Sequence, residues 1–354
     1  MLNVILRYCW RFKVINGNNL FRVVMNKIHQ ELISAIESEV GNLSQIGLFS
    51  GAAGLILYLW KASQTSQLVV NEQLLIDSFE KLQQNTHHVK RYSSLSYGVT
   101  GIGWLFEYIN QSQGVNYQPD FCSDLDNIIL EYVSTEMWTD EIEMVNGLAG
   151  LSVYASRRQR KKAQTDFFDQ LLSHYEQMAT YFDDQNLSWA QPKYSRYLFK
   201  KDDKDIPEYN LGLAHGMPSI IAAIIPVIKD SVLTKRAKVL VTSSCNWLLD
   251  QENHNSDIGS AFTNTTTANN KSRLGWCYGD LAIAVVLMRA GKVLNNIYFM
   301  SEAKRIALAT CNRGIKDASV FDAGLCHGSS GLAVMYKMLY NEFGNNQFIK
   351  ASKF

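Results

Sequence analysis

Six short turns, each with a glycine followed directly by an apolar segment, recur along this chain of 354 residues. They occupy residues 49–54, 96–101, 145–150, 214–219, 277–282 and 326–331. Aligned on glycines 51, 98, 147, 216, 279 and 328, they are separated by steps of 47, 49, 69, 63 and 49 residues. A step of this size holds two helices and their connections, so the sequence predicts a protein built from repeated helix pairs.

The two helices of each predicted pair differ in character. Residues 281–287, which follow the fifth glycine, are apolar on almost every side, and such a helix must be buried. The segments between the turns, such as 31–39 and 165–181, are amphipathic and more charged. We therefore expect an all-α fold, an α/α toroid with an inner ring of buried helices and an outer ring. Glycines at the turns would let inner helices approach one another closely at one mouth of the ring.

Charge and cysteine content narrow the class of partner and the compartment. The formal charge of +1 gives no reason to expect nucleic acid or an acidic membrane surface as a partner. The six cysteines are widely spread, which suits free thiols in a reducing, cytoplasmic setting. No apolar run reaches the roughly 18–20 residues of a membrane-spanning helix. Residues 1–24 are basic without an acidic residue and are interpreted as an extension or upstream start, with the repeat domain over 25–354.

Two turns carry residues that suit zinc. Cys277 and Cys326 both lie two residues before the aligned glycine, and His327 lies directly before it. Thiolate and imidazole are preferred zinc ligands, and three protein ligands leave a fourth position open, as in catalytic sites. His215 shares the position of His327 in its own repeat, so the same rim of the ring would carry it. The pattern predicts a zinc centre of Cys277, Cys326 and His327 with His215 nearby.

Other candidate residues have plainer interpretations. Cys122, Cys245 and Cys311 are taken as small buried hydrophobic residues. Arg273, Tyr278 and Glu143, judged from the residues alone, could equally be solvated or capping side chains. The histidines in polar or outer-helix segments are interpreted as surface residues: His29, His87, His88, His174 and His254.

At these motifs the chain resembles the lanthionine synthetase C-like family. The resemblance rests on Gly-Leu-Ala-His-Gly at 212–216, Trp-Cys-Tyr-Gly at 276–279 and Cys-His-Gly at 326–328, in family order, and the glycine turns extend it from about residue 25 to the end. It implies a zinc-dependent α/α toroid that cyclises a ribosomally made precursor peptide. A partner dehydratase would form dehydroalanine and dehydrobutyrine, and the cyclase would add a peptide cysteine across the double bond to give a lanthionine or methyllanthionine ring.

The resemblance also implies roles for individual residues. Cys277, Cys326 and His327 would hold the Zn²⁺, and the substrate thiolate would take the open position. His215 matches the catalytic histidine and would act as general acid or base. Arg273 matches an arginine suited to stabilising enolate charge, and Tyr278 matches an active-site tyrosine. Glu143 stands where the family usually has an aspartate, so its carboxylate reaches one methylene further.

One departure concerns the number of repeats. The family has seven inner helices, and six of the seven expected repeats are found before the sequence ends at Phe354. Three alternatives stay open. The first is a thiol-binding or thiol-adding protein of this fold that uses glutathione. The second, which the missing repeat supports, is a non-catalytic partner or inactive remnant of a cyclase, and the third is another α/α-toroid enzyme such as a prenyl-transfer enzyme or terpene cyclase. The Trp-Cys-Tyr-Gly and Cys-His-Gly motifs argue against the last. A peripheral membrane complex is compatible with the absence of a membrane-spanning run.

Overall fold

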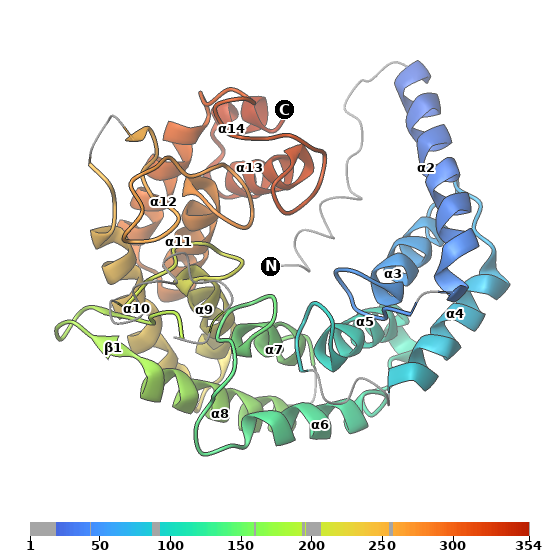
Figure 1. The fold of residues 1–354 in the computed structure, drawn as a ribbon, viewed down its shortest axis with the longest axis horizontal. Helices are drawn as coiled ribbons and strands as arrows, with labels where there is room; N and C mark the ends of the chain where they lie inside the picture. Colours follow the sequence, from blue (N-terminus) through green and yellow to red (C-terminus); the bar gives the residue numbers. More distant parts are fainter. Residues whose placement is uncertain are drawn as a thin grey trace. The chain divides into compact units, whose positions relative to one another are not determined.

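The computed structural model describes residues 19–42, 44–86, 93–158, 161–192, 195, 207–254 and 258–353 (Figure 1). These residues form two compact units. The N-terminal unit comprises the described residues within Phe12–Thr135 and Val153–Gln164, and the C-terminal unit those within Glu136–Ser152 and Thr165–Phe354. The two units are described separately below.

Every repeat glycine stands directly before a helix, as the sequence predicted. The six helices that follow these glycines are α3 (Ala52–Ser63), α5 (Val99–Ser112), α7 (Leu148–Ala155), α9 (Met217–Ile224), α11 (Asp280–Leu294) and α13 (Ser329–Phe343). Gly279 has a φ of 102°, a backbone conformation that side chains disfavour, and a Cβ at this position would overlap the carbonyl oxygen of Arg273. Glycine is therefore needed here for both backbone conformation and space.

The remaining helices alternate with these six. They are α2 (Asn19–Glu39), α4 (Glu72–Asn85), α6 (Ser123–Val133), α8 (Lys161–Met178), α10 (Thr234–Asp250), α12 (Ile297–Thr310) and α14 (Asn346–Ala351). Several begin with an asparagine cap: the side chain of Asn71 accepts the N–H of Leu74, and that of Asn296 accepts the N–H of Phe299. Short 3₁₀ turns (Val40–Asn42, Gly114–Asn116 and Ile225–Lys229) and a two-stranded hairpin of β1 (Thr180–Tyr181) and β2 (Leu187–Ser188) complete the described elements.

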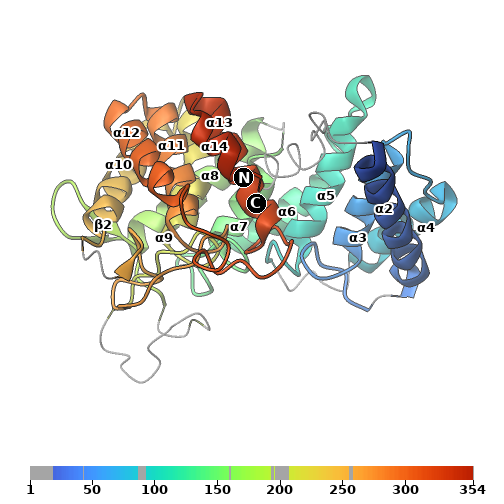
Figure 2. The ribbon, with the colours of Figure 1, turned by 90° about the horizontal axis from the view of Figure 1, so that it is seen from above.

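Helix α11 forms the centre of the C-terminal unit. All seven residues of 281–287 are buried, and α11 packs against α9, α10, α12 and α13 (Figure 2). Each buried aliphatic side chain contributes about 1.5–3 kcal/mol relative to exposure, so this helix is a major source of stability. In the N-terminal unit α5 has the corresponding role: its residues 99–108 are buried, and it packs against α3 and α6.

The structure bears on two expectations from the sequence, the exposure of His174 and the extent of the N-terminal segment. The interpretation of His174 as a surface residue was wrong: its side chain is 2% exposed and packs against the ring of Trp138. The amphipathic pattern of α8 was visible in sequence, but the aromatic neighbour that covers this histidine was not. Of the other histidines interpreted as surface residues, His87 and His88 lie outside the residues that the structure describes.

Residues 1–18 of the interpreted extension lie outside the described part, and α2 begins at Asn19, ahead of Met25. In the described part of the chain, no helix combines the length and apolar character needed to cross a membrane.

Candidate active site

Three of the glycine turns lie against one another in the C-terminal unit. The carbonyl oxygen of Cys326 accepts the N–H of Trp276 at 2.7 Å and that of Cys277 at 3.2 Å. The carbonyl oxygen of Cys277 in turn accepts the N–H of Ala214 at 3.2 Å. Backbone hydrogen bonds thus connect the turns before α9, α11 and α13, which carry most of the predicted site residues.

The two cysteine side chains are paired. The thiol of Cys326 donates a hydrogen bond to the sulfur of Cys277, which lowers the pKa of Cys277 to about 6 against the opposing effect of burial. The positive charge of Arg273 lowers it further. The same hydrogen bond, with burial, raises the pKa of Cys326. The pair therefore shares one proton at neutral pH, and its two ionisation steps belong to the pair as a whole.

The third predicted ligand, His327, has its ring fixed by a carboxylate. Its Nδ1 lies 2.8 Å from Oδ2 of Asp322, and the two side chains are 46% and 45% exposed. Nowhere among the described residues do three or more His, Cys, Asp or Glu side chains form a group placed to hold a metal ion. The chemistry of the donor set nonetheless fits zinc: two sulfurs already in contact, and an imidazole whose Nδ1 is bound by a carboxylate while Nε2 remains as the donor.

His215 and Glu143 form a second pair in the C-terminal unit. Nδ1 of His215 lies 3.3 Å from Oε2 of Glu143, whose side chain is 0% exposed. The carboxylate also accepts the N–H groups of Val145 at 2.5 Å and Asn146 at 2.8 Å. The backbone of its own turn thus holds Glu143 in place, and Glu143 orients the imidazole. The longer glutamate side chain still reaches the histidine.

Tyr278 and Arg273 border the thiol pair. Nδ2 of Asn210 donates to the phenolic oxygen of Tyr278 at 3.0 Å. Burial raises the pKa of Tyr278 to about 12, so the phenol stays protonated. Arg273 is half-buried and lies close enough to lower the pKa of Cys277. The predicted residues of the three turns therefore lie together, with Glu143 joined to them through His215.

Two polar residues of this site were not identified from the sequence. Asn210 and Asp322 each lie six residues before a repeat glycine, at Gly216 and Gly328. Arg273 has the same place relative to Gly279. An alignment of the turns that begins six residues before each glycine would have identified Asn210 and Asp322 from the sequence.

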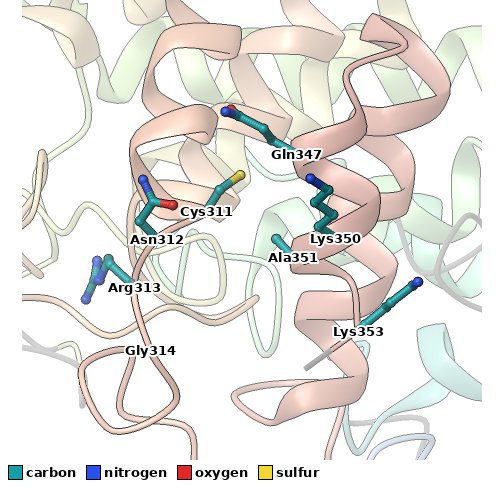
Figure 3. Close-up of a pocket in the computed structure, with 8 residues that line it drawn as sticks. All are labelled: Cys311, Asn312, Arg313, Gly314, Gln347, Lys350, Ala351 and Lys353. Carbon is teal, nitrogen blue, oxygen red and sulfur yellow. The ribbon is translucent and has the colours of Figure 1, made fainter.

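A separate pocket of about 390 Å³ lies between the segment after α12 and helix α14 (Figure 3). None of the predicted site residues lines it; the lining residues are Cys311, Asn312, Arg313, Gly314, Gln347, Lys350, Ala351 and Lys353.

Cys311 is half-buried, whereas Cys122 and Cys245 are fully buried as the sequence predicted.

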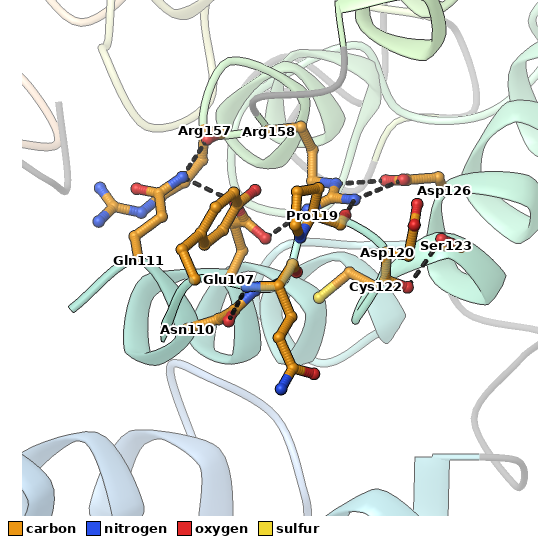
Figure 4. Close-up of polar contacts among 12 residues, drawn as sticks. Glu107, Asn110, Gln111, Pro119, Asp120, Cys122, Ser123, Asp126, Arg157 and Arg158 are labelled. Atoms are coloured by element: carbon orange, nitrogen blue, oxygen red, sulfur yellow. Dashed lines mark hydrogen bonds and ion pairs between the residues drawn. The ribbon is translucent and has the colours of Figure 1, made fainter. Parts of the chain in front are cut away.

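The N-terminal unit contains a polar cluster of a different kind, centred on Arg158 (Figure 4). The guanidinium binds both carboxylate oxygens of Asp126, at 2.7 and 2.8 Å, and also contacts Glu107. Glu107 additionally accepts hydrogen bonds from Tyr117 at 2.8 Å and Gln111 at 2.7 Å. Burial alone would lower the pKa of Arg158, but the two carboxylates raise it overall. This cluster is almost fully enclosed, with an arginine side chain that is 3% exposed.

The chain is similar to known proteins of one family. The sequence matches the family described as lanthionine synthetase C-like protein over residues 25–354. The chain belongs to the lanthionine synthetase C-like family. Among solved structures it is similar to one described as nisin cyclase, with a TM-score of 0.72 and 14% sequence identity, over 93% of this chain and 85% of that one. At this identity the likeness shows the fold, and it confirms the all-α toroid class predicted from the sequence.

Proposed function

We propose that this member of the family is a zinc-dependent peptide cyclase. It adds a cysteine thiolate of a ribosomally made peptide to dehydroalanine or dehydrobutyrine, forming a lanthionine or methyllanthionine thioether. The observation that carries the proposal is the hydrogen-bonded pair of Cys277 and Cys326, held by the backbone beside the turn that carries His215. Buried structural cysteines are typically inert, whereas this pair shares a proton and lies near the cationic side chain of Arg273.

Cys277, Cys326 and His327 are the residues that would hold zinc. Bound there, the metal would act as a Lewis acid that lowers the pKa of the substrate thiol. The chain itself supplies the rest of the chemistry. Nδ1 of His215 is occupied by Glu143, which leaves Nε2 to take the thiol proton and return it to the product.

The addition balances without any other reactant. The substrate sulfur bonds to the β-carbon of the dehydro residue, and the electron pair of the double bond moves onto the adjacent carbonyl as an enolate. Arg273 stabilises the negative charge on the enolate oxygen. The protonated His215 then delivers its proton to the α-carbon. Tyr278, kept protonated and oriented by Asn210, provides a further hydrogen-bond donor.

The partners follow from this chemistry. The substrate must carry both a cysteine and a dehydrated serine or threonine, so a dehydratase that acts on the same precursor peptide is the partner that supplies it. Free peptide thiols persist in a reducing compartment, and we place the reaction in the cytoplasm. A peripheral complex with a membrane-bound dehydratase or exporter is compatible with this arrangement.

The test combines zinc content with a cyclisation assay. Purified protein is analysed for zinc and incubated with a synthetic peptide that contains one dehydroalanine and one cysteine, and ring formation is followed as loss of the alkylatable thiol. We expect about one zinc per chain. Cys326→Ala should lose both zinc and activity, and His215→Asn should keep zinc but cyclise about 10²–10⁴-fold more slowly. Cys245→Ala, at a buried cysteine away from the site, is the matched control.

The same assay separates the alternatives. Faster addition of free glutathione than of the peptide's own cysteine would favour a thiol-adding protein. A folded protein that holds zinc but reacts with neither thiol would favour a non-catalytic partner. A folded protein without zinc would contradict the proposal.

A further inference from the structure

Asp322 makes three hydrogen-bond contacts within the turn that carries Cys326 and His327. Its Oδ2 lies 2.8 Å from Nδ1 of His327, and its Oδ1 accepts the N–H of Gly324 at 2.6 Å. Its carbonyl oxygen accepts the N–H of Ser329, the first residue of α13, at 3.0 Å. The carboxylate is therefore fixed by its own backbone on one side and faces the imidazole on the other.

The turn is shaped around this carboxylate. A Cβ at Gly328 would overlap Oδ1 of Asp322 and the backbone nitrogen of Gly324. Glycine at 328 thus leaves the space that the side chain of Asp322 occupies. The contact with His327 depends on a close-packed turn, although both side chains are about half exposed.

The equivalent residue two repeats earlier uses the same geometry. Oδ1 of Asn210 accepts the N–H of Gly212 at 2.9 Å, and its carbonyl oxygen accepts the N–H of Met217 at 2.9 Å. A Cβ at Gly216 would overlap this asparagine, as one at Gly328 would overlap Asp322. The remaining polar side-chain atom, Nδ2, donates a hydrogen bond to the phenolic oxygen of Tyr278 at 3.0 Å.

Asp322 and Asn210 therefore share one function, which is to orient a ring. In both cases the ring belongs to the residue directly before a repeat glycine, Tyr278 before Gly279 and His327 before Gly328. The two differ in chemistry. The neutral amide of Asn210 donates to a phenol, whereas the carboxylate of Asp322 accepts from an imidazole N–H.

We infer that Asp322 is a positioning residue for His327. By accepting the Nδ1 proton, it fixes the tautomer in which the Nε2 lone pair is free to bind a metal, and it holds the ring against rotation. This inference rests on the proposed function, because it concerns the ring as a zinc ligand. In this role Asp322 would act through His327, the histidine that its carboxylate faces.

The experiment measures metal affinity rather than activity. Metal-free wild type, Asp322→Asn and Asp322→Ala are titrated with Co²⁺, and zinc affinity is then obtained by competition with a chelator. We expect both variants to bind about 10–100-fold more weakly, as is typical for loss of such a carboxylate. The thiolate-to-cobalt charge-transfer band should persist, because both cysteines remain. Circular dichroism of the metal-free variants checks the fold.

Asp317→Asn is the matched control. Asp317 lies in the same connection between α12 and α13, is about half exposed, and pairs with Lys271 rather than with a histidine. It should bind metal as the wild type does. An equal loss in Asp317→Asn and Asp322→Asn would show that any charge change in this segment matters, which would overturn the specific role of Asp322.

A second measurement needs no metal. Long-range ¹H–¹⁵N NMR spectra of the metal-free protein, with the His327 signals assigned from His327→Gln, report the tautomer. We expect the Nδ1-protonated form in wild type and a mixture in Asp322→Ala.

The two failures are distinguishable. Absence of metal binding by wild type would contradict the proposed function, while the NMR spectra would still show whether Asp322 fixes the ring. Wild-type affinity in both Asp322 variants would overturn the positioning role and leave the zinc site intact. Tighter binding in the variants would mean that Asp322 competes with the metal for Nδ1, which also overturns it.

Discussion

Two buried glutamates, one in each unit, show how the same residue type can serve a structural purpose in one place and a chemical purpose in another. Glu107 and Glu143 are both 0% exposed. Glu107 faces the guanidinium of Arg158 and also accepts hydrogen bonds from Tyr117 and Gln111. Glu143 instead accepts two backbone N–H groups, and its Oε2 lies 3.3 Å from Nδ1 of the part-exposed His215.

The difference lies in what faces each carboxylate. A guanidinium stays protonated at any physiological pH, so the cluster around Arg158 keeps one charge state and stabilises the fold. An imidazole can both accept and donate a proton, so the pair of Glu143 and His215 is suited to proton transfer. The thiols of the two units also differ in pKa. Burial raises the pKa of Cys122, whereas the hydrogen bond from Cys326 lowers the pKa of Cys277. The enclosed cluster around Arg158 therefore has a structural role in the N-terminal unit. The part-exposed pair of His215 and Glu143 is suited to chemistry.

The largest expected contrast is in thiol reactivity of the metal-free protein. Burial raises the pKa of Cys122 to about 12, whereas the pKa of Cys277 is lowered to about 6 by the hydrogen bond from Cys326. Cys277 is thus mostly thiolate above pH 6, and Cys122 stays protonated throughout the native range. The thiolate of lower pKa is intrinsically less nucleophilic, which offsets part of this difference, so we expect iodoacetamide to label Cys277 on the order of 10²-fold faster at pH 7.

Mass spectrometry of the labelled peptides measures both rates against pH. The rate at Cys277 should rise between about pH 5 and 7 and then level off, following its pKa. In denaturant the two cysteines should react alike. A rate at Cys277 that keeps rising up to pH 9 would contradict the shared-proton pair.

Arg158→Ala tests the enclosed cluster. Removing the guanidinium leaves the carboxylates of Glu107 and Asp126 buried without their charged partner, which costs about 3–5 kcal/mol in the free energy of unfolding. Urea denaturation followed by circular dichroism measures it. Arg305→Ala is the matched control, because Arg305 is half-exposed and pairs with Glu252 and Glu302 at the surface. That change should cost less than about 1 kcal/mol. Equal effects of the two changes would show that burial of the cluster adds nothing.

Exchanging each buried glutamate for glutamine gives the smallest but most discriminating effects. Glu107→Gln removes a charge opposite Arg158, so we expect a loss of about 1–3 kcal/mol in stability. Glu143→Gln weakens the hold on His215, so we expect kcat for cyclisation to fall about 10–100-fold while KM changes little. Denaturation and steady-state kinetics are measured on both variants. Loss of stability without loss of kcat in Glu143→Gln would remove the functional distinction between the two residues.

The fold was largely predictable because its repeat is local. A glycine followed by an apolar helix recurs six times, and each helix begins at the residue after the glycine. Steric need for glycine at the turn and burial of an all-apolar helix are properties of short segments, so they are visible in the sequence. The register of the turns also brought Cys277, Cys326 and His327 into consideration together.

Contacts between side chains of different turns were not predictable in this way. The burial of His174 depends on Trp138, and the ion cluster of the N-terminal unit joins Glu107, Asp126 and Arg158 across 51 and 32 residues of sequence. Asp322 looks like an ordinary loop aspartate until the turn around Gly328 brings it to His327. The proton shared by the thiols likewise depends on two sulfurs in contact.

The sequence by itself thus determined where the six helices after the glycines begin, that such apolar helices are buried, and which residues recur at equivalent positions of the turns. Only the tertiary structure decided which of those residues touch, which carboxylate faces a guanidinium and which an imidazole, and which two thiols share a hydrogen bond. The physical reason is that helix starts and burial follow from steric and hydrophobic properties that act over a few residues, whereas hydrogen bonds and pKa shifts depend on distances of about 3 Å between atoms far apart in the chain.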